Sequence, residues 1–157
     1  MILRRTLIKQ TVAVLGLSLI GLPARAQQSF PFTLTDDAWR ARLSPAAYAV
    51  LREEDTERAG TSPLDKETRD GMYHCAGCDQ AVYSSAHKFD SGTGWPSFWQ
   101  AVAGATGTKP DPGLFGSRTE EHCSNCGGHL GHVFDDGPAP TGRRHCINGV
   151  ALSFKSA

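Results

Sequence analysis

The sequence has no excess of charge of either sign and no long hydrophobic run. Lys and Arg together number 16, as do Asp and Glu, so the chain has no electrostatic basis for binding nucleic acid. A membrane-spanning helix needs about 20 apolar residues. The longest apolar run, residues 12–22, is about half that length and is interrupted by Gly16, Ser18 and Gly21. We therefore expect no permanent membrane anchor.

The first 26 residues have the layout of an export signal. Arg4 and Arg5 precede the apolar run, and small residues at Ala24 and Ala26 follow it, as at a signal cleavage site. The start, residues 4–9, also resembles a twin-arginine signal. This predicts a periplasmic protein that begins at Gln27. Removing the segment removes four basic residues and no acid, which leaves 12 basic against 16 acidic residues.

The mature chain is predicted to be an extended leader, residues 27–34, followed by one domain, residues 35–157. Thr35 and Asp36 can cap a short helix to about Leu43, and Ser44 before Pro45 is typical of a second helix start. From Gly71 onward, short β-prone segments favour a mainly β fold with antiparallel sheets. Predicted strands cover residues 72–74, 80–83, 130–134, 145–147 and 151–154. Residues 101–116, rich in Gly, Pro and Thr, are predicted to form a surface loop.

Four of the five cysteines form two Cys-x-x-Cys knuckles. The knuckles are Cys75 with Cys78 and Cys123 with Cys126, separated by 44 residues. Two such pairs are typical of one tetrahedral zinc ion, and a closed four-thiolate site makes that zinc structural. Two structural disulfides or a dithiol redox pair are the alternatives. No Cys-x-x-Cys is followed by His, which argues against covalent c-type haem.

Cys146 is the fifth cysteine and the candidate nucleophile. Arg144, two residues earlier, can share its strand face, and a cation there favours the thiolate. A single cysteine in a β-segment can equally be a small buried hydrophobe. His129 and His132 could form a metal site or lie on the surface, and the segment around Trp95 could line a pocket or pack as a turn on the core.

Three ordered blocks resemble the signature blocks of the B-type methionine sulfoxide reductases. They are residues 88–98, which contain Gly92, Gly94 and Trp95; residues 129–138, with both histidines; and residues 144–148, which contain Cys146. With the two knuckles and residues 48–58, the resemblance spans about residues 36–154. It implies two antiparallel β-sheets with short N-terminal helices, one zinc ion on four cysteines, and reduction of methionine-R-sulfoxide in oxidised proteins.

The resemblance also implies roles for individual residues. Cys146 would attack the sulfoxide sulfur, and His129 and His132 would hold and protonate the oxygen so that it leaves as water. Asn148 and Arg144 would complete the polar shell. The substrate-binding residues implied in this way are Trp95, which would pack on the methyl group, Phe134, and Asp136, which would orient His132.

Two residues depart from the family pattern. His145 replaces the aromatic residue usual before the nucleophile, and strand alternation predicts that it points away from the pocket. Thr93 stands where many members have a second, resolving cysteine. With the other cysteines assigned to zinc, the sulfenic acid on Cys146 has no internal thiol partner. We therefore expect an external donor, either a thioredoxin-like protein or a small thiol.

Two other functions fit parts of the sequence. A non-catalytic binding module could use the same zinc scaffold, since fold alone does not set function. A thiol-disulfide oxidoreductase could work through the knuckles. The joint presence of Cys146, His129, His132, Asn148 and Trp95 favours the reductase, which we expect to act as a monomer.

The signal layout gives the first testable prediction. Replacing both Arg4 and Arg5 with lysine should block export, because the twin-arginine machinery recognises the arginine pair rather than the charge. The measurement is the amount of mature protein, beginning at Gln27, in the periplasmic fraction. Normal export of the double variant would reject the twin-arginine assignment and leave an ordinary secretory route.

Overall fold

The computed structural model describes residues 29–113 and 116–157. The predicted signal, residues 1–26, and the predicted mature start at Gln27 lie outside the described residues. In the described part of the leader, Phe30 and Phe32 pack against the domain. The Phe30 ring lies edge-on to His122, with 5.6 Å between ring centroids, and the Phe32 amide donates to the Asn125 carbonyl at 2.8 Å.

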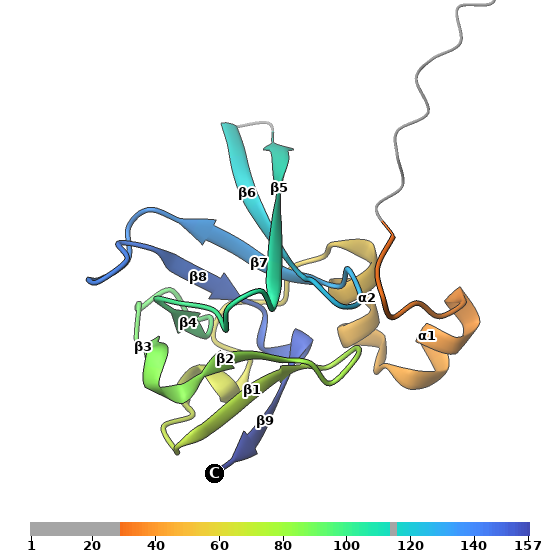
Figure 1. Ribbon diagram of the computed structural model, residues 1–157, viewed down its shortest axis with the longest axis horizontal. Coiled ribbons are helices and arrows are strands. Elements are labelled where there is room, and N and C mark those ends of the chain that lie inside the picture. The colour runs from red at the N-terminus through yellow and green to blue at the C-terminus, as the bar shows by residue number, and fades with distance from the viewer. Residues whose placement is uncertain (1–28, 114–115) are drawn as a thin grey trace, which may run out of the picture.

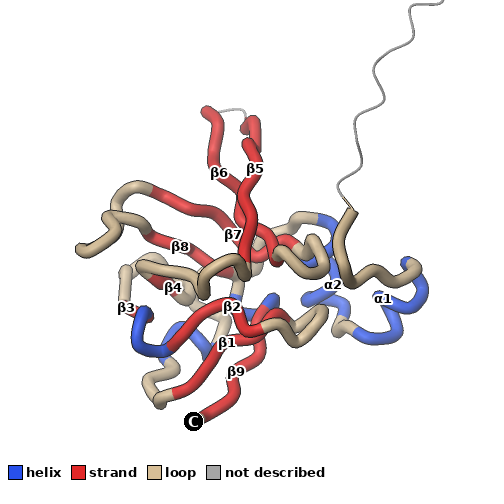
Figure 2. The backbone as a smooth tube through the Cα atoms, in the orientation of Figure 1, coloured by secondary structure: helices blue, strands red, loops and turns tan. Residues whose placement is uncertain are grey.

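The two N-terminal helices begin at the residues that the sequence predicts. Helix α1, Asp36–Arg42, begins after Thr35, whose side chain accepts a hydrogen bond from the Ala38 amide at 3.3 Å. Helix α2, Pro45–Glu53, begins after Ser44, whose hydroxyl accepts from the Ala47 amide at 3.2 Å. Each cap satisfies an amide that has no partner inside its helix. Both helices lie at the same end of the sheets (Figure 2).

Two antiparallel sheets form the rest of the domain (Figure 1). The smaller sheet has the order β2-β1-β9, and the larger has the order β3-β4-β8-β7-β6-β5. This confirms the predicted fold class. The strands of the smaller sheet are β1 (Gly71–Cys75), β2 (Ala81–Ser84) and β9 (Leu152–Ser156). Those of the larger sheet are β3 (Lys88–Phe89), β4 (Ser97–Phe98), β5 (Thr106–Gly113), β6 (Gly116–Cys123), β7 (His129–Phe134) and β8 (Arg144–Ile147). Three short 3-10 turns complete the elements: η1 (Pro63–Lys66), η2 (Ser85–His87) and η3 (Gly149–Ala151).

All five predicted strands exist, but the predicted surface loop at residues 101–116 is wrong. Half of this stretch forms β5, which pairs with β6 over its whole length. Strand β5 is at the edge of the sheet, where a proline can be accommodated because the outer edge needs no amide donor. Pro110 and Pro112 therefore do not prevent pairing. The β5–β6 hairpin extends beyond the other strands in Figure 1.

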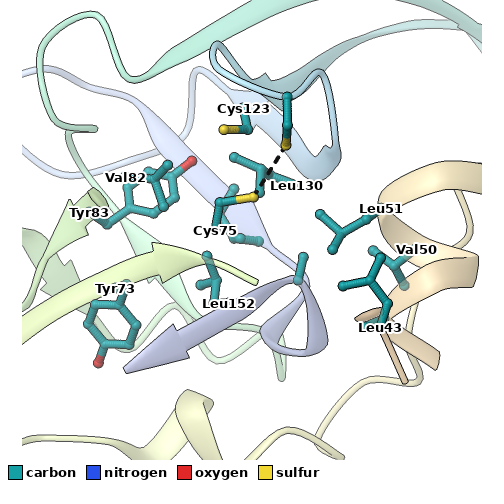
Figure 3. Close-up of a cluster of buried hydrophobic side chains, with 14 of the residues drawn as sticks. Leu43, Val50, Leu51, Tyr73, Cys75, Val82, Tyr83, Cys123, Leu130 and Leu152 are labelled. Atoms are coloured by element: carbon teal, nitrogen blue, oxygen red, sulfur yellow. Dashed lines mark hydrogen bonds between the residues drawn. The ribbon is translucent and has the colours of Figure 1, made fainter. Parts of the chain in front are cut away.

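The hydrophobic core lies between the two sheets and extends to α2. Tyr83 of β2 stacks on Phe98 of β4, with 4.3 Å between ring centroids. Figure 3 shows Cys75 and Cys123 in the middle of this core, between Tyr83 on one side and Leu51 of α2 on the other. The sulfur cluster is therefore part of the core rather than an attachment on the surface.

An ionisable pair of side chains is also buried in this core. The side chain of Glu121 is fully buried, and its carboxylate lies 2.8 Å and 3.0 Å, through its two oxygens, from Nδ1 of the buried His145. His145 thus points to the face of β8 opposite Cys146, as strand alternation predicts. In the described part of the chain, no helix is long and apolar enough to cross a membrane.

Candidate functional site

The strand register of the larger sheet brings the predicted residues together. Cys146 of β8 lies directly opposite Ser97 of β4 on one side and His132 of β7 on the other. His132 in turn lies opposite Glu120 of β6. Side chains of directly opposed residues lie on the same face of a sheet. One row across four strands therefore carries a hydroxyl, a thiol, an imidazole and a carboxylate.

A cavity of about 120 Å³ opens at this row. Its predicted lining residues are Cys146, His132, Asn148, Trp95 and Phe134, and its other lining residues are Thr56, Arg118 and Gly131. A Cβ on Gly131 would lie 2.0 Å from the Cys146 carbonyl oxygen. Only glycine therefore fits beside the cysteine strand at this point.

The environment of Cys146 has opposing effects on its ionisation. Burial raises the pKa of the Cys146 thiol, and the Thr93 hydroxyl and the Arg144 guanidinium act in the opposite direction. The Thr93 oxygen lies 3.9 Å from the sulfur. The predicted effect of Arg144 is thus present, but burial outweighs it. The balance of these effects favours the thiol over the thiolate.

Asp136 does not contact His132, and the predicted contact between them is wrong. Its carboxylate accepts two hydrogen bonds from Arg144, both at 2.8 Å, and its side chain is 61% exposed. This pairing lowers the pKa of Asp136 and raises that of Arg144. Arg144 also lies over the Phe134 ring, 4.4 Å from its centroid. Arg144 lies opposite Phe134, two positions along β7 from His132, and its bidentate hydrogen bonding explains why the Asp136 carboxylate turns away from the imidazole.

Asp111 of β5 is the acid that contacts His132. Its carboxylate lies 2.9 Å from His132 Nε2 and also accepts hydrogen bonds from Arg118 at 2.6 Å and 3.0 Å. Burial lowers the pKa of His132, and the bond to Asp111 opposes this. The hydrogen bond to His132 lowers the pKa of Asp111. The carboxylate therefore favours the charged imidazolium inside a partly apolar cavity.

His129 lies behind the cavity rather than on its wall. His129 is only 2% exposed, and its ring centroid is 5.4 Å from that of His132. Its Nδ1 lies 3.1 Å from a Glu120 oxygen, at ion-pair distance but without hydrogen-bond geometry. Lys109 lies 3.0 Å from the other Glu120 oxygen. His129 thus contacts the site through His132.

The backbone of Glu57 holds two lining residues in place. Its amide donates to Asn148 Oδ1 at 2.9 Å, and its carbonyl accepts from Trp95 Nε1 at 3.1 Å. The Asn148 amide group also donates to the Leu130 carbonyl at 3.0 Å. The Glu57 carboxylate accepts hydrogen bonds from the amides of Gly149 and Val150. Burial raises the pKa of Glu57, and these two amides oppose the rise.

The four knuckle cysteines form one compact cluster. Their sulfur atoms all lie within 4.8 Å of one another, with 3.7 Å between Cys75 and Cys126 and 3.5 Å between Cys78 and Cys123. All are free thiols, and a disulfide needs about 2.05 Å between its sulfurs. A tetrahedron with metal–sulfur bonds of about 2.3 Å has edges of about 3.8 Å. The cluster therefore has the shape of a four-thiolate metal site.

Asp111, Arg118 and Glu120 were not predicted as site residues, because the β5–β6 hairpin that carries them was not predicted. The sequence does contain a strand pattern in residues 117–122, directly before the knuckle of Cys123 and Cys126. Arg118 and Glu120 alternate directly ahead of Cys123, which is the pattern of a strand that presents both side chains on one face. Glu57 gave no signal beyond its place in the resemblance, since it acts mainly through its backbone.

A family model and the similar proteins agree on one family. The SelR domain model matches residues 43–156. Peptide methionine sulfoxide reductase MsrB of Thioalkalivibrio sulfidiphilus is 49% identical over 131 residues, which cover 83% of this chain and 96% of that protein. The protein of that name from Thiobacillus denitrificans is 53% identical over 121 residues, which cover 76% and 92%. The crystal structure of the Mis18 "Yippee-like" domain matches 57% of this chain and 98% of its own, with a TM-score of 0.47 and 17% identity.

The contact between Asp111 and His132 gives the second prediction. In Asp111→Asn the pKa of His132 should fall further below its usual value, because the carboxylate that favours the imidazolium is gone while the burial remains. The measurement is an NMR titration of the His132 ring. Asp136→Asn is the matched control and should leave the His132 titration unchanged. A fall in the control alone would assign the orienting role to Asp136 after all.

Proposed function

Since the chain belongs to the SelR domain family and is a peptide methionine sulfoxide reductase of the B type, we propose that Cys146 is its nucleophile and methionine-R-sulfoxide its substrate. The observation that supports this best is the cavity in which Cys146, His132, Asn148 and Trp95 meet. Its volume, about 120 Å³, suits the end of one side chain. Oxidised proteins that expose such a side chain are the proposed partners.

The reaction begins with attack by the Cys146 sulfur on the sulfoxide sulfur. A sulfur–sulfur bond forms and the sulfur–oxygen bond breaks, while the oxygen takes up two protons and leaves as water. Water then adds to the Cys146 sulfur and releases one proton, and methionine departs with the electron pair of the sulfur–sulfur bond. Methionine sulfoxide is reduced by two electrons, and Cys146 is oxidised by two to a sulfenic acid.

The other residues around the cavity have separate proposed roles in the reaction. His132, held by Asp111, donates a proton to the sulfoxide oxygen, and the second amide hydrogen of Asn148 orients that oxygen. His129 does not reach the cavity and is proposed to act by positioning His132. Trp95 and Phe134 form the apolar wall for the methyl group, and Arg144 favours the thiolate.

We propose that the four-cysteine cluster binds one structural zinc ion. The four sulfurs lie within 4.8 Å of one another, so four thiolates there would repel one another without a cation. A dication lets all four become thiolates at sulfur distances that already suit it. The set has no open position, so the zinc contributes stability and no Lewis acid chemistry.

Loss of one ligand gives the third prediction. Cys126→Ser should lose zinc and lower the melting temperature by about 10 °C or more, because the binding energy of such a metal is folding energy. The measurements are metal content and thermal unfolding of the mature protein. Cys146→Ser, the same substitution outside the cluster, should keep its zinc and its melting temperature. A zinc-free Cys126→Ser that melts normally would contradict the proposal.

Regeneration is proposed to depend on an external thiol. The sulfenic acid on Cys146 condenses with one donor thiol and releases water, and a second thiol releases Cys146 as a donor disulfide forms. Thr93, whose side-chain oxygen lies 3.9 Å from the Cys146 sulfur, cannot form a disulfide. A thioredoxin-like protein or a small thiol supplies both electrons. Export by the twin-arginine route to the periplasm remains our proposal from the signal layout.

The fourth prediction follows the sulfenic acid. Without a donor, one turnover on an R-sulfoxide peptide should release one methionine per protein and leave a sulfenic acid that dimedone traps on Cys146. Cys146→Ser should abolish the reaction at every donor concentration, since a hydroxyl lacks the redox chemistry. Thr93→Cys should instead form a disulfide with Cys146, because the side-chain atoms at these positions already lie 3.9 Å apart.

Peptide mapping of the oxidised protein separates the alternatives. A disulfide between Cys146 and a knuckle cysteine in the wild type, with zinc released in step with turnover, would show that the knuckles regenerate the enzyme. Equal turnover of both sulfoxide epimers would contradict the proposed substrate class.

A further inference from the structure

Three hydroxyl groups form a chain that ends at the sulfur of Cys146. Ser97 Oγ lies 2.7 Å from Ser91 Oγ, and Ser91 Oγ lies 2.8 Å from Thr93 Oγ1. Thr93 Oγ1 then lies 3.9 Å from Cys146 Sγ. Ser97 is fully buried and lies opposite Cys146 in the strand register. The chain therefore begins and ends at neighbouring points of the same sheet.

The hydrogen bonds among the hydroxyl groups of Ser97, Ser91 and Thr93 can run in either of two directions. Each hydroxyl donates one hydrogen bond and can accept others. In one direction Ser97 donates to the Trp95 carbonyl at 3.1 Å, Ser91 donates to Ser97, and Thr93 donates to Ser91. Thr93 can then only accept a hydrogen bond from the Cys146 thiol. This direction suits the protonated cysteine.

The opposite direction suits the thiolate. Ser97 donates to Ser91, Ser91 donates to Thr93, and Thr93 donates to the sulfur. Only the bond from Ser97 to the Trp95 carbonyl is given up. Because the donors polarise one another, the final hydrogen bond is stronger than that of an isolated hydroxyl. A hydrogen bond to an ionised group is in turn stronger than one to a neutral group.

We propose that the hydroxyl chain of Ser97, Ser91 and Thr93 reverses direction when Cys146 ionises and stabilises the thiolate. The thiol proton passes to water, and no other atom is transferred. Thr93, which contacts the reacting sulfur, is a catalytic residue, and Ser91 and Ser97 are positioning residues. The inference rests on the proposed role of Cys146 and gives Thr93 a function besides its lack of a thiol.

The loop that carries Thr93 is held in place, so the hydroxyl keeps its position. Asp90 accepts a hydrogen bond from the Gly92 amide at 2.9 Å. The Gly94 carbonyl accepts one from the Gly60 amide at 2.7 Å. Gly92 and Gly94 have φ of 72° and 86°, a region that favours glycine. The backbone therefore fixes Thr93 between these two anchored glycines.

Other ionisable groups also act on the Cys146 sulfur. Arg144 precedes it on β8 and favours the thiolate, while Asp136, which pairs with Arg144, disfavours it. His132 faces it from β7. On the β4 side the neighbour is Ser97, which does not ionise. Substitutions in the hydroxyl chain leave all three ionisable groups unchanged.

The test measures the ionisation of Cys146 without using catalysis. Zinc-loaded mature protein reacts with iodoacetamide across a range of pH, and mass spectrometry follows alkylation of the Cys146 peptide. The variants are Thr93→Val, which keeps the shape and removes the hydroxyl, Thr93→Ser, which keeps the hydroxyl, and Ser91→Ala. Thr141→Val is the matched control, since its hydroxyl donates to the Trp99 carbonyl and accepts from the Arg143 amide, outside the hydroxyl chain.

Thr93→Val should be alkylated about tenfold more slowly near neutral pH, with its midpoint moved to higher pH. Ser91→Ala should change the rate in the same direction by a smaller factor, and Thr93→Ser and Thr141→Val should behave as the wild type. An unchanged midpoint in Thr93→Val would overturn the proposal. A changed alkylation midpoint in Thr93→Val with an unchanged one in Ser91→Ala would overturn the proposed hydroxyl chain and leave Thr93 acting alone.

Activity measured in parallel separates this inference from the proposed function. A slower alkylation with unchanged sulfoxide reduction would contradict the role of Cys146 as the nucleophile. Loss of reduction by Cys146→Ser with unchanged alkylation in all chain variants would support that role and overturn the hydroxyl chain. Circular dichroism confirms folding, and Ser91→Ala keeps the proposal testable if Thr93→Val does not fold.

Discussion

Four sulfur atoms within 4.8 Å of one another join the two sheets. Cys75 ends β1 of the smaller sheet and Cys123 ends β6 of the larger one, and the other two cysteines follow in the next turns. Thiolates at this distance repel one another, so the zinc ion that we propose is what keeps the joint closed. Strand β7 begins three residues after the second knuckle. The position of His132, and hence of the cavity, depends on that joint.

The site itself comes from antiparallel register rather than from any local motif. Residues from β4, β8, β7 and β6 form one row because opposed residues share a face. Ser97 and Cys146 are far apart in the sequence and adjacent in the sheet. A shift of one residue in any of these pairings would turn the side chains to the other face and dismantle the row. Gly131 leaves room for the close approach of β7 and β8 on which the row depends.

Sequence reasoning worked where a local physical rule decides the outcome. Thr35 and Ser44 marked both helix starts because a cap satisfies amides nearby, and the knuckle spacing gathered four sulfurs because each turn presents two of them. The β5–β6 hairpin escaped prediction because an edge strand accepts proline and glycine, which otherwise indicate a loop. The partner of Asp136 escaped it as well. Both Arg144 and His132 are close to Asp136 in the sequence, and only the folded structure shows that the Asp136 carboxylate binds Arg144 while His132 binds Asp111.

The buried pair of Glu121 and His145 has a consequence for how this sequence can evolve. The two residues are 24 positions apart, on β6 and β8, and their side chains lie 2.8 Å apart in the core. Losing one of them leaves a polar or charged group buried without its partner, which is costly, whereas replacing both with apolar residues of similar volume is close to neutral. The two positions are therefore epistatic: a change that is tolerated at one depends on the residue present at the other. An apolar residue at position 145 with Glu121 unchanged would therefore lower the stability of the domain.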